Sequence, residues 1–232
     1  MNSPIALVTG ASRGLGRALA AGLAREGYSL ILDARNERAL DDAAADLGTK
    51  VIALQGDVTD PAHRTALRTA VADLGGLDLL VNNAGTLGAH PLPALADYPV
   101  DQLRSAFEVN VLAPIALTQL LLPTLRARGG AVLNVTSDAA VEAYSGWGGY
   151  GAAKAALEQA SNVLAAEEPT VRVWWVDPGD LRTEMHQQAF PGEDISDRPL
   201  PAAIVPGFVR LVTERLPSGR YRAADLLPVV RS

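Results

Sequence analysis

The sequence predicts an α/β fold: a single domain, 1–232, built on a doubly wound parallel β-sheet with helices on both faces. Two observations carry this prediction. Short apolar runs alternate along the whole chain with stretches of helical periodicity, which is the pattern of strands joined by crossover helices. The first apolar run, 5–9, leads directly into a glycine-rich turn and then into a helix. A chain of 232 residues is also long enough to bury one large core.

The first half of the chain supplies four strands and three helices. An apolar face marks the first helix, an alanine-rich stretch the second, and the capping Asp60 with Pro61 the start of the third. In order, we expect a strand at 5–9, a helix with Leu15, Ala18, Leu19, Gly22 and Leu23 on one face, a strand at 29–33, a helix at 37–47, a strand at 51–55, a helix at 60–74 and a strand at 77–81.

The second half continues the alternation. An otherwise apolar stretch that carries Asn110 predicts one long helix, and alanines and leucines on one face predict another. A proline-rich stretch, 191–206, predicts a mobile insertion or lid around 184–206. The expected order is a helix at 101–125, a strand at 131–136, a helix at 149–167, a strand at 171–176, the lid, and a last helix at about 204–215.

Composition argues against several functions. The formal net charge of −6 disfavours nucleic acid as the main partner. The absence of cysteine excludes disulfides, thiolate metal sites and cysteine nucleophiles, and the three histidines are too widely spaced to predict a metal site. Residues 1–4 lead into a strand without a basic signal region, and the uncharged stretch 109–125 is short for a bilayer span. We therefore expect a cytoplasmic protein with no membrane partner.

The turn Gly10-Ala11-Ser12-Arg13-Gly14-Leu15-Gly16 carries the first functional signal. A strand, a glycine turn and a helix in this order aim backbone N–H groups and the positive end of the helix at a phosphate. The glycines permit a tight turn and the close approach of a ligand. Glycines that serve packing alone are the alternative, and the Gly-x-x-x-Gly-x-Gly spacing differs from the commoner dinucleotide motif.

The stretch from Tyr150 to Lys154 carries the second signal. Residues four apart lie on one face of a helix, so this spacing sets a phenol beside an ammonium. A nearby positive charge favours the phenolate and lowers the tyrosine pKa from its usual value of about 10. The pair therefore predicts a general acid and base. The spacing also arises by chance, but Lys154 is one of only two lysines, which indicates that a compact ammonium is wanted there.

Several polar residues follow predicted strands and should meet at one edge of the sheet. Ligands bind at the carboxyl ends of the strands in such sheets, and Asp57, Asn83, Ser137 and the Pro178-Gly179 turn all fall there with the glycine turn. Asn83 could equally read a ligand or tie a turn together. Asn110 is either a structural tie or a member of a proton relay, and the residues alone favour the tie.

These motifs together resemble those of the short-chain dehydrogenase/reductase family, over essentially the full length of the chain. The interval from Ser137 to Tyr150 (150 − 137 = 13) is also typical of that family. The resemblance implies a single-domain, Rossmann-like fold. It rests on Thr9-Gly10-x-x-x-Gly14-x-Gly16, Asn82-Asn83-Ala84-Gly85, Ser137, Tyr150-x-x-x-Lys154 and Pro178-Gly179.

The resemblance implies four catalytic residues. Tyr150 would protonate a carbonyl oxygen as hydride arrives from a nicotinamide, and Ser137 would hydrogen-bond the same oxygen. Lys154 would bind the nicotinamide ribose and lower the tyrosine pKa, and Asn110 would belong to the proton relay. The residues expected to bind the cofactor are Thr9, Gly10, Ser12, Arg13, Gly14, Leu15, Gly16, Arg35, Asp57, Val58, Asn83, Ala84, Gly85, Tyr150, Lys154, Pro178, Gly179, Leu181 and Thr183.

We therefore expect an NADP(H)-dependent oxidoreductase that interconverts a carbonyl and a secondary alcohol on a small to medium organic molecule. The alternative is a nicotinamide-binding regulator that keeps the fold and does no turnover. A regulator has no need of Ser137, Tyr150, Lys154 and Asn110 together, so their joint presence favours the enzyme.

The end of the second strand favours NADP(H) over NAD(H). An acid there binds the adenosine ribose and selects NAD, whereas an arginine accommodates the 2′-phosphate of NADP. The family's acid would fall at Ala34, and Asp33 points to the opposite face because side chains alternate along a strand. Arg35 can then reach the phosphate, with Arg13 as a second cation. A solvated residue at a helix start is the alternative for Arg35.

The substrate pocket and the assembly involve the lid and the two apolar helices. Tyr144, Trp147, His186 and Phe190 either line a pocket for an apolar or aromatic ketone or aldehyde, or serve equally well in packing. The helices at 101–125 and 149–167 carry more apolar surface than one sheet needs. In the resembled family they pair across a two-fold axis, so we expect a homodimer or homotetramer.

Overall fold

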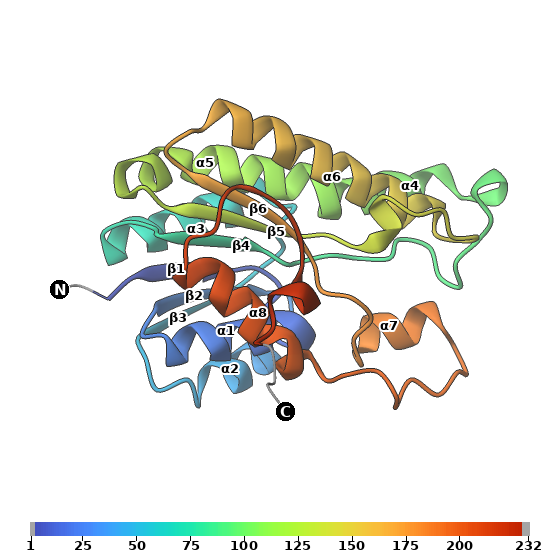
Figure 1. Ribbon diagram of the computed structural model, residues 1–232, viewed down its shortest axis with the longest axis horizontal. Coiled ribbons are helices and arrows are strands. Elements are labelled where there is room, and N and C mark those ends of the chain that lie inside the picture. The colour runs from blue at the N-terminus through green and yellow to red at the C-terminus, as the bar shows by residue number, and fades with distance from the viewer. Residues whose placement is uncertain (1–2, 229–232) are drawn as a thin grey trace.

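The computed structural model describes residues 3–228, which form three layers with a parallel sheet in the middle (Figure 1). Within these residues seven strands stand in the order β3-β2-β1-β4-β5-β6-β7, and each neighbouring pair is parallel. The predicted fold class, a doubly wound parallel sheet flanked by helices, is confirmed. The ends of the expected 1–232 domain, residues 1–2 and 229–232, lie outside the described residues.

The elements alternate as the sequence predicts. The strands are β1 (Ile5–Val8), β2 (Ser29–Ala34), β3 (Val51–Gln55), β4 (Leu79–Asn82), β5 (Ala131–Val135), β6 (Arg172–Asp177) and β7 (Gly219–Arg222). The helices are α1 (Gly14–Arg25), α2 (Glu37–Ala44), α3 (Pro61–Leu74), α4 (Val100–Phe107), α5 (Ala113–Arg128), α6 (Gly148–Glu167), α7 (Glu184–Ala189) and α8 (Pro201–Thr213). Shorter turns are η1 (Leu95–Asp97), η2 (Glu108–Leu112), η3 (Asp138–Ala140) and η4 (Ala223–Leu226).

Each face of the sheet has its own apolar core. Side chains alternate along a strand, so Leu30 and Leu32 of β2 join the core under α1 and α8, whereas Ile31 joins the core under α3 and α5. Trp174 and Phe208 are the largest buried side chains of the first core. The chain winds outward in opposite directions from β1 and from β4. The carboxyl ends of the strands beside this reversal are where such sheets bind ligands.

The single helix predicted over 101–125 is wrong: α4 and α5 are separated by the π-helical turn η2. The N–H of Ala113 donates to the carbonyl of Glu108, five residues back. Pro114 has no N–H for the carbonyl of Asn110, four residues before it, so regular α-helical bonding cannot pass this point. The wider turn places Asn110 inside the molecule, fully buried. Single π turns of this kind are frequent at functional sites.

One helical stretch among residues 3–228, Val100–Arg128, is long and apolar enough to cross a membrane by length and composition alone. In the structure, 44% of its apolar window is buried inside the molecule, where α5 covers the sheet. Core helices of globular domains pass the same test, so this stretch is weak evidence for a membrane protein.

The C-terminal part differs from expectation in two places. The last helix, α8, runs over Pro201–Thr213 and starts earlier than the predicted helix at 204–215, so its first residues and α7 both lie within the segment 184–206, whose role as a lid stays a prediction. Proline suits the first turn of a helix, which explains the earlier start. The strand β7 was not predicted, because its four residues, Gly-Arg-Tyr-Arg, contain no apolar run and lie at the edge of the sheet beside β6.

Candidate active site

The glycine turn between β1 and α1 lies at the carboxyl edge of the sheet. Gly10 and Gly14 have positive φ angles of 65° and 55°, which residues with a side chain rarely adopt. A Cβ on Gly16 would collide with the carbonyl oxygen of Gly10 and with the side chain of Asn83. No side chain caps the start of α1, and its first turn contains no acid. The first N–H groups of α1 therefore receive no hydrogen bond acceptor from a capping side chain. They could donate to a bound pyrophosphate instead.

Thr9 and Asn83 fasten the glycine turn to the turn after β4. The hydroxyl oxygen of Thr9 accepts the N–H groups of Asn83 and Ala84, both at 3.0 Å. The amide nitrogen of Asn83 donates to the carbonyls of Thr9 and Gly10, at 2.9 and 3.2 Å. Of the two alternatives for Asn83, the structure shows the turn tie, and its contact with a cofactor stays a prediction.

Asp33 is buried on the α3 side of the sheet, as the register argument predicts. One carboxylate oxygen lies 2.8 Å from Nε2 of His63 on α3, and the other accepts the N–H of Gly10 at 3.4 Å. Burial raises the pKa of Asp33, and the contact with His63 opposes that rise. Both oxygens are thus occupied inside the protein. Sequence reasoning missed His63, because nothing local marks a contact with a residue thirty positions away.

The two arginines expected at an adenosine phosphate are both exposed but face different groups. Partial burial works to raise the pKa of Asp57, yet hydrogen bonds from the N–H and hydroxyl of Thr59 and the positive charge of Arg35 hold it below its usual range. Arg35 is therefore on the Asp57 side of the site. Arg13 instead forms an ion pair with Glu184, the first residue of α7. The two arginines therefore have different partners in this structure.

Helix α6 places Tyr150 and Lys154 against the end of β5. Both side chains are buried, and Nζ of Lys154 lies 5.5 Å from the centre of the Tyr150 ring. The ammonium donates to the carbonyl of Val135 at 2.8 Å. A Cβ on Gly85 would lie 3.0 Å from Oδ1 of Asn110 and 3.8 Å from Nζ of Lys154. The turn after β4 therefore lies beside Lys154.

The pKa expected for Tyr150 is wrong in sign for this structure. Burial raises the pKa of Tyr150, the carboxylates of Asp177 and Asp138 raise it further, and the neighbouring Ser137 hydroxyl acts in the opposite direction. Burial also lowers the pKa of Lys154 to about 8, because the charged form loses its water. Burial is the largest of these effects on Tyr150, and it favours the protonated phenol.

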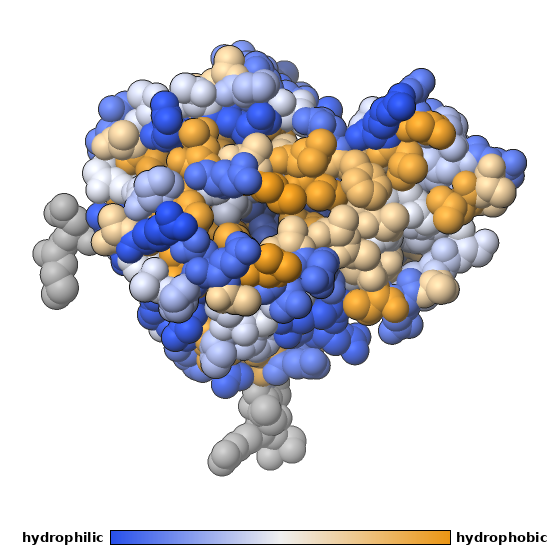
Figure 2. Space-filling model, turned by 90° about the horizontal axis from the view of Figure 1, so that it is seen from above, coloured by the Kyte–Doolittle hydropathy of each residue, from blue (hydrophilic) through white to orange (hydrophobic). Residues whose placement is uncertain are grey.

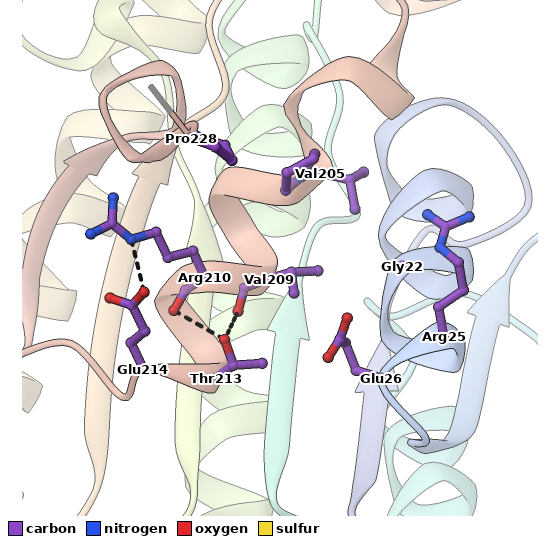
Figure 3. Close-up of a pocket in the computed structure, with 10 residues that line it drawn as sticks. Gly22, Arg25, Glu26, Val205, Val209, Arg210, Thr213, Glu214 and Pro228 are labelled. Carbon is purple, nitrogen blue, oxygen red and sulfur yellow. Dashed lines mark hydrogen bonds and ion pairs between the residues drawn. The ribbon is translucent and has the colours of Figure 1, made fainter. Parts of the chain in front are cut away.

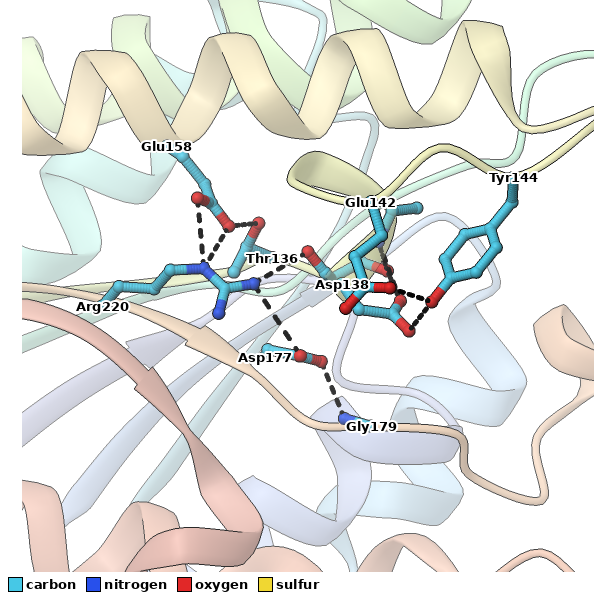
Figure 4. Close-up of polar contacts among 10 residues, drawn as sticks. Thr136, Asp138, Glu142, Tyr144, Glu158, Asp177, Gly179 and Arg220 are labelled. Atoms are coloured by element: carbon cyan, nitrogen blue, oxygen red, sulfur yellow. Dashed lines mark hydrogen bonds and ion pairs between the residues drawn. The ribbon is translucent and has the colours of Figure 1, made fainter.

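Ser137 lies two residues after β5 and caps the start of η3, where it contacts Asp138. The Ser137 hydroxyl donates to Oδ1 of Asp138 at 2.9 Å and accepts the N–H of Ala139 at 3.2 Å. The other oxygen of Asp138 accepts the hydroxyl of Tyr144 at 3.0 Å (Figure 4). This bond raises the pKa of Tyr144 to about 12. Asp138 therefore controls the direction of the Ser137 hydroxyl as well as the charge beside Tyr150.

Asn110 forms a tie between η2 and the turn after β4. Its Oδ1 accepts the N–H of Thr86 at 3.1 Å, and its Nδ2 donates to the carbonyls of Thr86 and Ala106 at 2.8 and 2.9 Å. These bonds agree with the structural alternative that the residues alone favour. The role in a proton relay stays a prediction.

An aromatic row connects Tyr150 to α7. The rings of Tyr150 and Trp147 are 5.7 Å apart, those of Trp147 and Phe190 5.9 Å, and those of Phe190 and His186 4.8 Å. Tyr144 is more exposed and is held by Asp138. The row lies where a pocket wall beside Tyr150 would stand, and its members also pack on one another, so both alternatives for these residues stay open.

The segment after β6 completes the site. Gly179 has a positive φ angle of 72° and donates its N–H to Asp177 at 2.9 Å. Leu181 is buried in the core under α1, and Thr183 caps α7. The methyl group of Thr183 would lie 3.6 Å from a Cβ on Gly14. The structure therefore brings Thr183 to the glycine turn, although it follows that turn by more than 160 residues.

A separate groove of about 530 Å³ lies between α1 and α8 (Figure 3). Val205 and Val209 form its apolar wall opposite Gly22, and Glu26 and Arg210 stand at its rim. These residues include the last turn of α1, at the edge of the sheet opposite the glycine turn. The groove is therefore distinct from the candidate active site.

The chain is similar to known proteins over most of its length. The family model described as short chain dehydrogenase matches residues 4–194. The chain is 34% identical over 222 residues to the oxidoreductase YciK of Escherichia coli, covering 91% of this chain and 87% of that protein. It is 37% identical over 201 residues to the sepiapterin reductase of Mus musculus, covering 80% of this chain and 77% of that protein.

Among solved structures, a short chain dehydrogenase from Shigella flexneri in complex with NADP superposes with a TM-score of 0.88. The two chains are 32% identical, and the match covers 97% of this chain and 98% of that one.

Proposed function

The chain belongs to the short-chain dehydrogenase family, and we propose that it is an NADP(H)-dependent oxidoreductase that interconverts a carbonyl and a secondary alcohol on a small to medium organic molecule. The observation that carries the proposal is the meeting of Ser137, Tyr150 and Lys154 at one edge of the sheet with an uncapped glycine turn. The cytoplasm remains its expected place in the cell.

The cofactor follows from the turn and from the end of β2. Gly10, Gly14 and Gly16 would line the pyrophosphate, because the backbone N–H groups at the start of α1 favour an anion. Asp33 cannot serve a ribose while both of its oxygens are bound inside the protein. Arg35 is exposed on the Asp57 side, where it can meet a 2′-phosphate. The relative from Shigella flexneri, solved with NADP, supports the same preference.

Side chains of the protein would transfer the proton of the reaction. When bound, the nicotinamide supplies or accepts the hydride. Tyr150 carries a proton at neutral pH, since its pKa is raised, and would donate it to the oxygen of a carbonyl substrate. The Ser137 hydroxyl would turn from Asp138 toward that oxygen and hold it in place. Lys154 would favour the phenolate that remains, because it is the nearby cation on the same helix.

The row of Trp147, Phe190 and His186 supports an apolar or aromatic ketone or aldehyde as substrate. Apolar and aromatic side chains with a few polar groups are the usual lining of small-molecule sites. Here the polar groups at the end of the row are the hydroxyls of Tyr150 and Ser137.

Tyr150→Phe tests the proton donor, because it keeps the ring and removes the hydroxyl. We expect turnover of NADPH with a panel of ketones and aldehydes to fall by at least about a hundredfold, as for loss of a general acid. NADPH affinity, followed by fluorescence, should change by less than about twofold, since a hydroxyl contributes little to uniform binding. Tyr28→Phe, at the opposite edge of the sheet, is the matched control.

Turnover near the wild-type value in Tyr150→Phe would contradict the assignment of Tyr150 as proton donor. A wild type that turns over no member of the panel would favour the regulator.

Asp138→Asn tests how a neighbouring carboxylate acts on the pKa of Tyr150. The Asp138 carboxylate raises the pKa of Tyr150, so its removal lowers that pKa, and the phenolate needed for alcohol oxidation forms at lower pH. We expect the rise of kcat/KM with pH, measured for NADP⁺ and an alcohol, to move to lower pH. Glu142→Gln is the control, because Glu142 contacts Tyr144. If the pH profile of kcat/KM in Asp138→Asn is unchanged or moves to higher pH, Asp138 does not raise the pKa of Tyr150 as proposed.

Arg35→Ala tests the choice of cofactor. Loss of a charge-assisted hydrogen bond to the 2′-phosphate should reduce the ratio of kcat/KM for NADPH over NADH by about tenfold or more. Arg38→Ala, an exposed arginine three residues later on α2, should leave the ratio unchanged. A wild-type preference for NADH, or an unchanged ratio in Arg35→Ala, would show that Asp33 reads the ribose after all.

The outer face of α5 and α6 supports a homodimer or homotetramer. Val163 of α6 is exposed by 43%, Ala152 is exposed on the same face of α6, and Leu112, the last residue of η2 before α5, is exposed by 51%. Figure 2 looks onto the layer of α4, α5 and α6 and shows apolar surface gathered between hydrophilic margins. Exposed apolar patches of this kind mark interfaces between protein chains. Light scattering at micromolar concentration should report at least twice the mass of one chain, 24.3 kDa, and a monomer would refute the proposal.

A further inference from the structure

Arg220 of β7 touches three elements that carry the candidate active site (Figure 4). Its Nε donates to both carboxylate oxygens of Glu158 on α6, at 2.9 and 3.2 Å. One of its Nη atoms donates to the main-chain carbonyl of Ser137, at 3.2 Å. The same nitrogen lies 3.8 Å from the carboxylate of Asp177 at the end of β6.

The partners of Arg220 are themselves bound to the chain around them. Thr136, at the end of β5, donates its hydroxyl to Glu158 at 2.8 Å. Asp177 accepts the N–H of Gly179 at 2.9 Å, so the contact extends to the turn that follows β6. Glu158 and Asp177 are both buried, and two buried carboxylates are costly unless a cation lies between them. The Arg220 guanidinium is that cation.

The same group of charges faces Tyr150. Ser137 and Asp138 approach the phenol from η3, Lys154 from α6 and Asp177 from β6. Burial raises the pKa of Asp177, and the charges of Arg220 and Arg222 oppose the rise. Since the Asp177 carboxylate raises the pKa of Tyr150, the cation that holds and partly neutralises Asp177 also limits its effect on the phenol.

We propose that Arg220 is a positioning residue for the reaction. It holds the carbonyl of Ser137 and the carboxylate of Asp177 against Glu158, and so fixes the ends of β5 and β6 relative to the helix that carries Tyr150 and Lys154. The role rests on the proposed function, because the reaction is what requires Ser137 and Tyr150 to be held in register. A planar fork with several donors suits three acceptors at once, which a lysine ammonium does not match.

The first test compares Arg220→Gln with Arg222→Gln, which removes an equal charge from the exposed neighbour two residues along β7. Hydrogen–deuterium exchange of the protein without substrate should quicken at 136–140 and at 177–180 in Arg220→Gln and stay unchanged in Arg222→Gln. Exchange at wild-type rates in both segments of Arg220→Gln overturns the proposal, whatever its turnover.

The second test is kinetic. Misplacement of catalytic groups reduces kcat more than it raises KM, so Arg220→Gln should lose about tenfold in kcat with a change below about twofold in KM for NADPH. The rise of alcohol oxidation with pH should move to higher pH, because Asp177 acts on Tyr150 without its cation. Arg220→Lys should restore part of kcat. An unchanged kcat and pH profile in Arg220→Gln overturns the proposal.

Glu158→Gln keeps the shape of the partner and removes its charge, and it serves as a second variant if Arg220→Gln does not fold. If the two side chains act as one unit, the double variant should lose no more kcat than the more impaired single variant. If the fold-losses in kcat of the two single variants multiply in the double variant, Arg220 acts independently of Glu158, and the proposal is overturned. If the wild type turns over no substrate, the proposed function is wrong. The hydrogen–deuterium exchange measurement would still decide whether Arg220 holds residues 136–140 and 177–180 in place.

Discussion

The rest of the site depends on the hydrogen bonds between Thr9 and Asn83. They join the end of β1 to the end of β4, which are the two strands on either side of the reversal of the sheet. Gly16 must lack a side chain because this tie fills the space beside it. From Asn83 the chain continues through Gly85, where a Cβ would lie 3.0 Å from Oδ1 of Asn110 and 3.8 Å from Nζ of Lys154, to Thr86, whose backbone Asn110 holds. The cofactor turn, Asn83 and Asn110 therefore belong to one hydrogen-bonded framework, and Lys154 lies beside it.

Desolvation is the dominant electrostatic effect in this framework. It is the largest cause of the raised pKa of Tyr150, Asp33 and Asp177 and of the lowered pKa of Lys154. Each buried charge is accordingly matched: Asp33 by His63, Lys154 by a carbonyl, Glu158 and Asp177 by Arg220. A helical spacing of Tyr and Lys reports their proximity, whereas the sign of the pKa shift depends on burial and on carboxylates from other elements.

The fold class, six of the seven strands and the convergence of Ser137, Tyr150 and the glycine turn could be predicted from the sequence. Periodicity and motifs are local, and parallel strands bring their carboxyl ends to one edge. What could not be predicted depends on tertiary contacts or on weak local signals. His63 meets Asp33 from thirty positions away, and Arg220 meets Glu158 from 62. β7 takes its strand form from pairing with β6, since its four residues have no apolar pattern of their own.

The π turn at η2 has a consequence for how this chain can vary in length. A π turn is what one additional residue leaves in an α-helix, so deleting one residue within 108–112 would rotate α4 by about 100° relative to α5. Ala106, now buried, would turn away from the core, and Asn110 would lose its reach to Thr86. Pro114 would still offer no N–H to the turn before it. The number of residues between α4 and α5 is therefore constrained by the hydrogen bonds that Asn110 makes with Thr86 and Ala106.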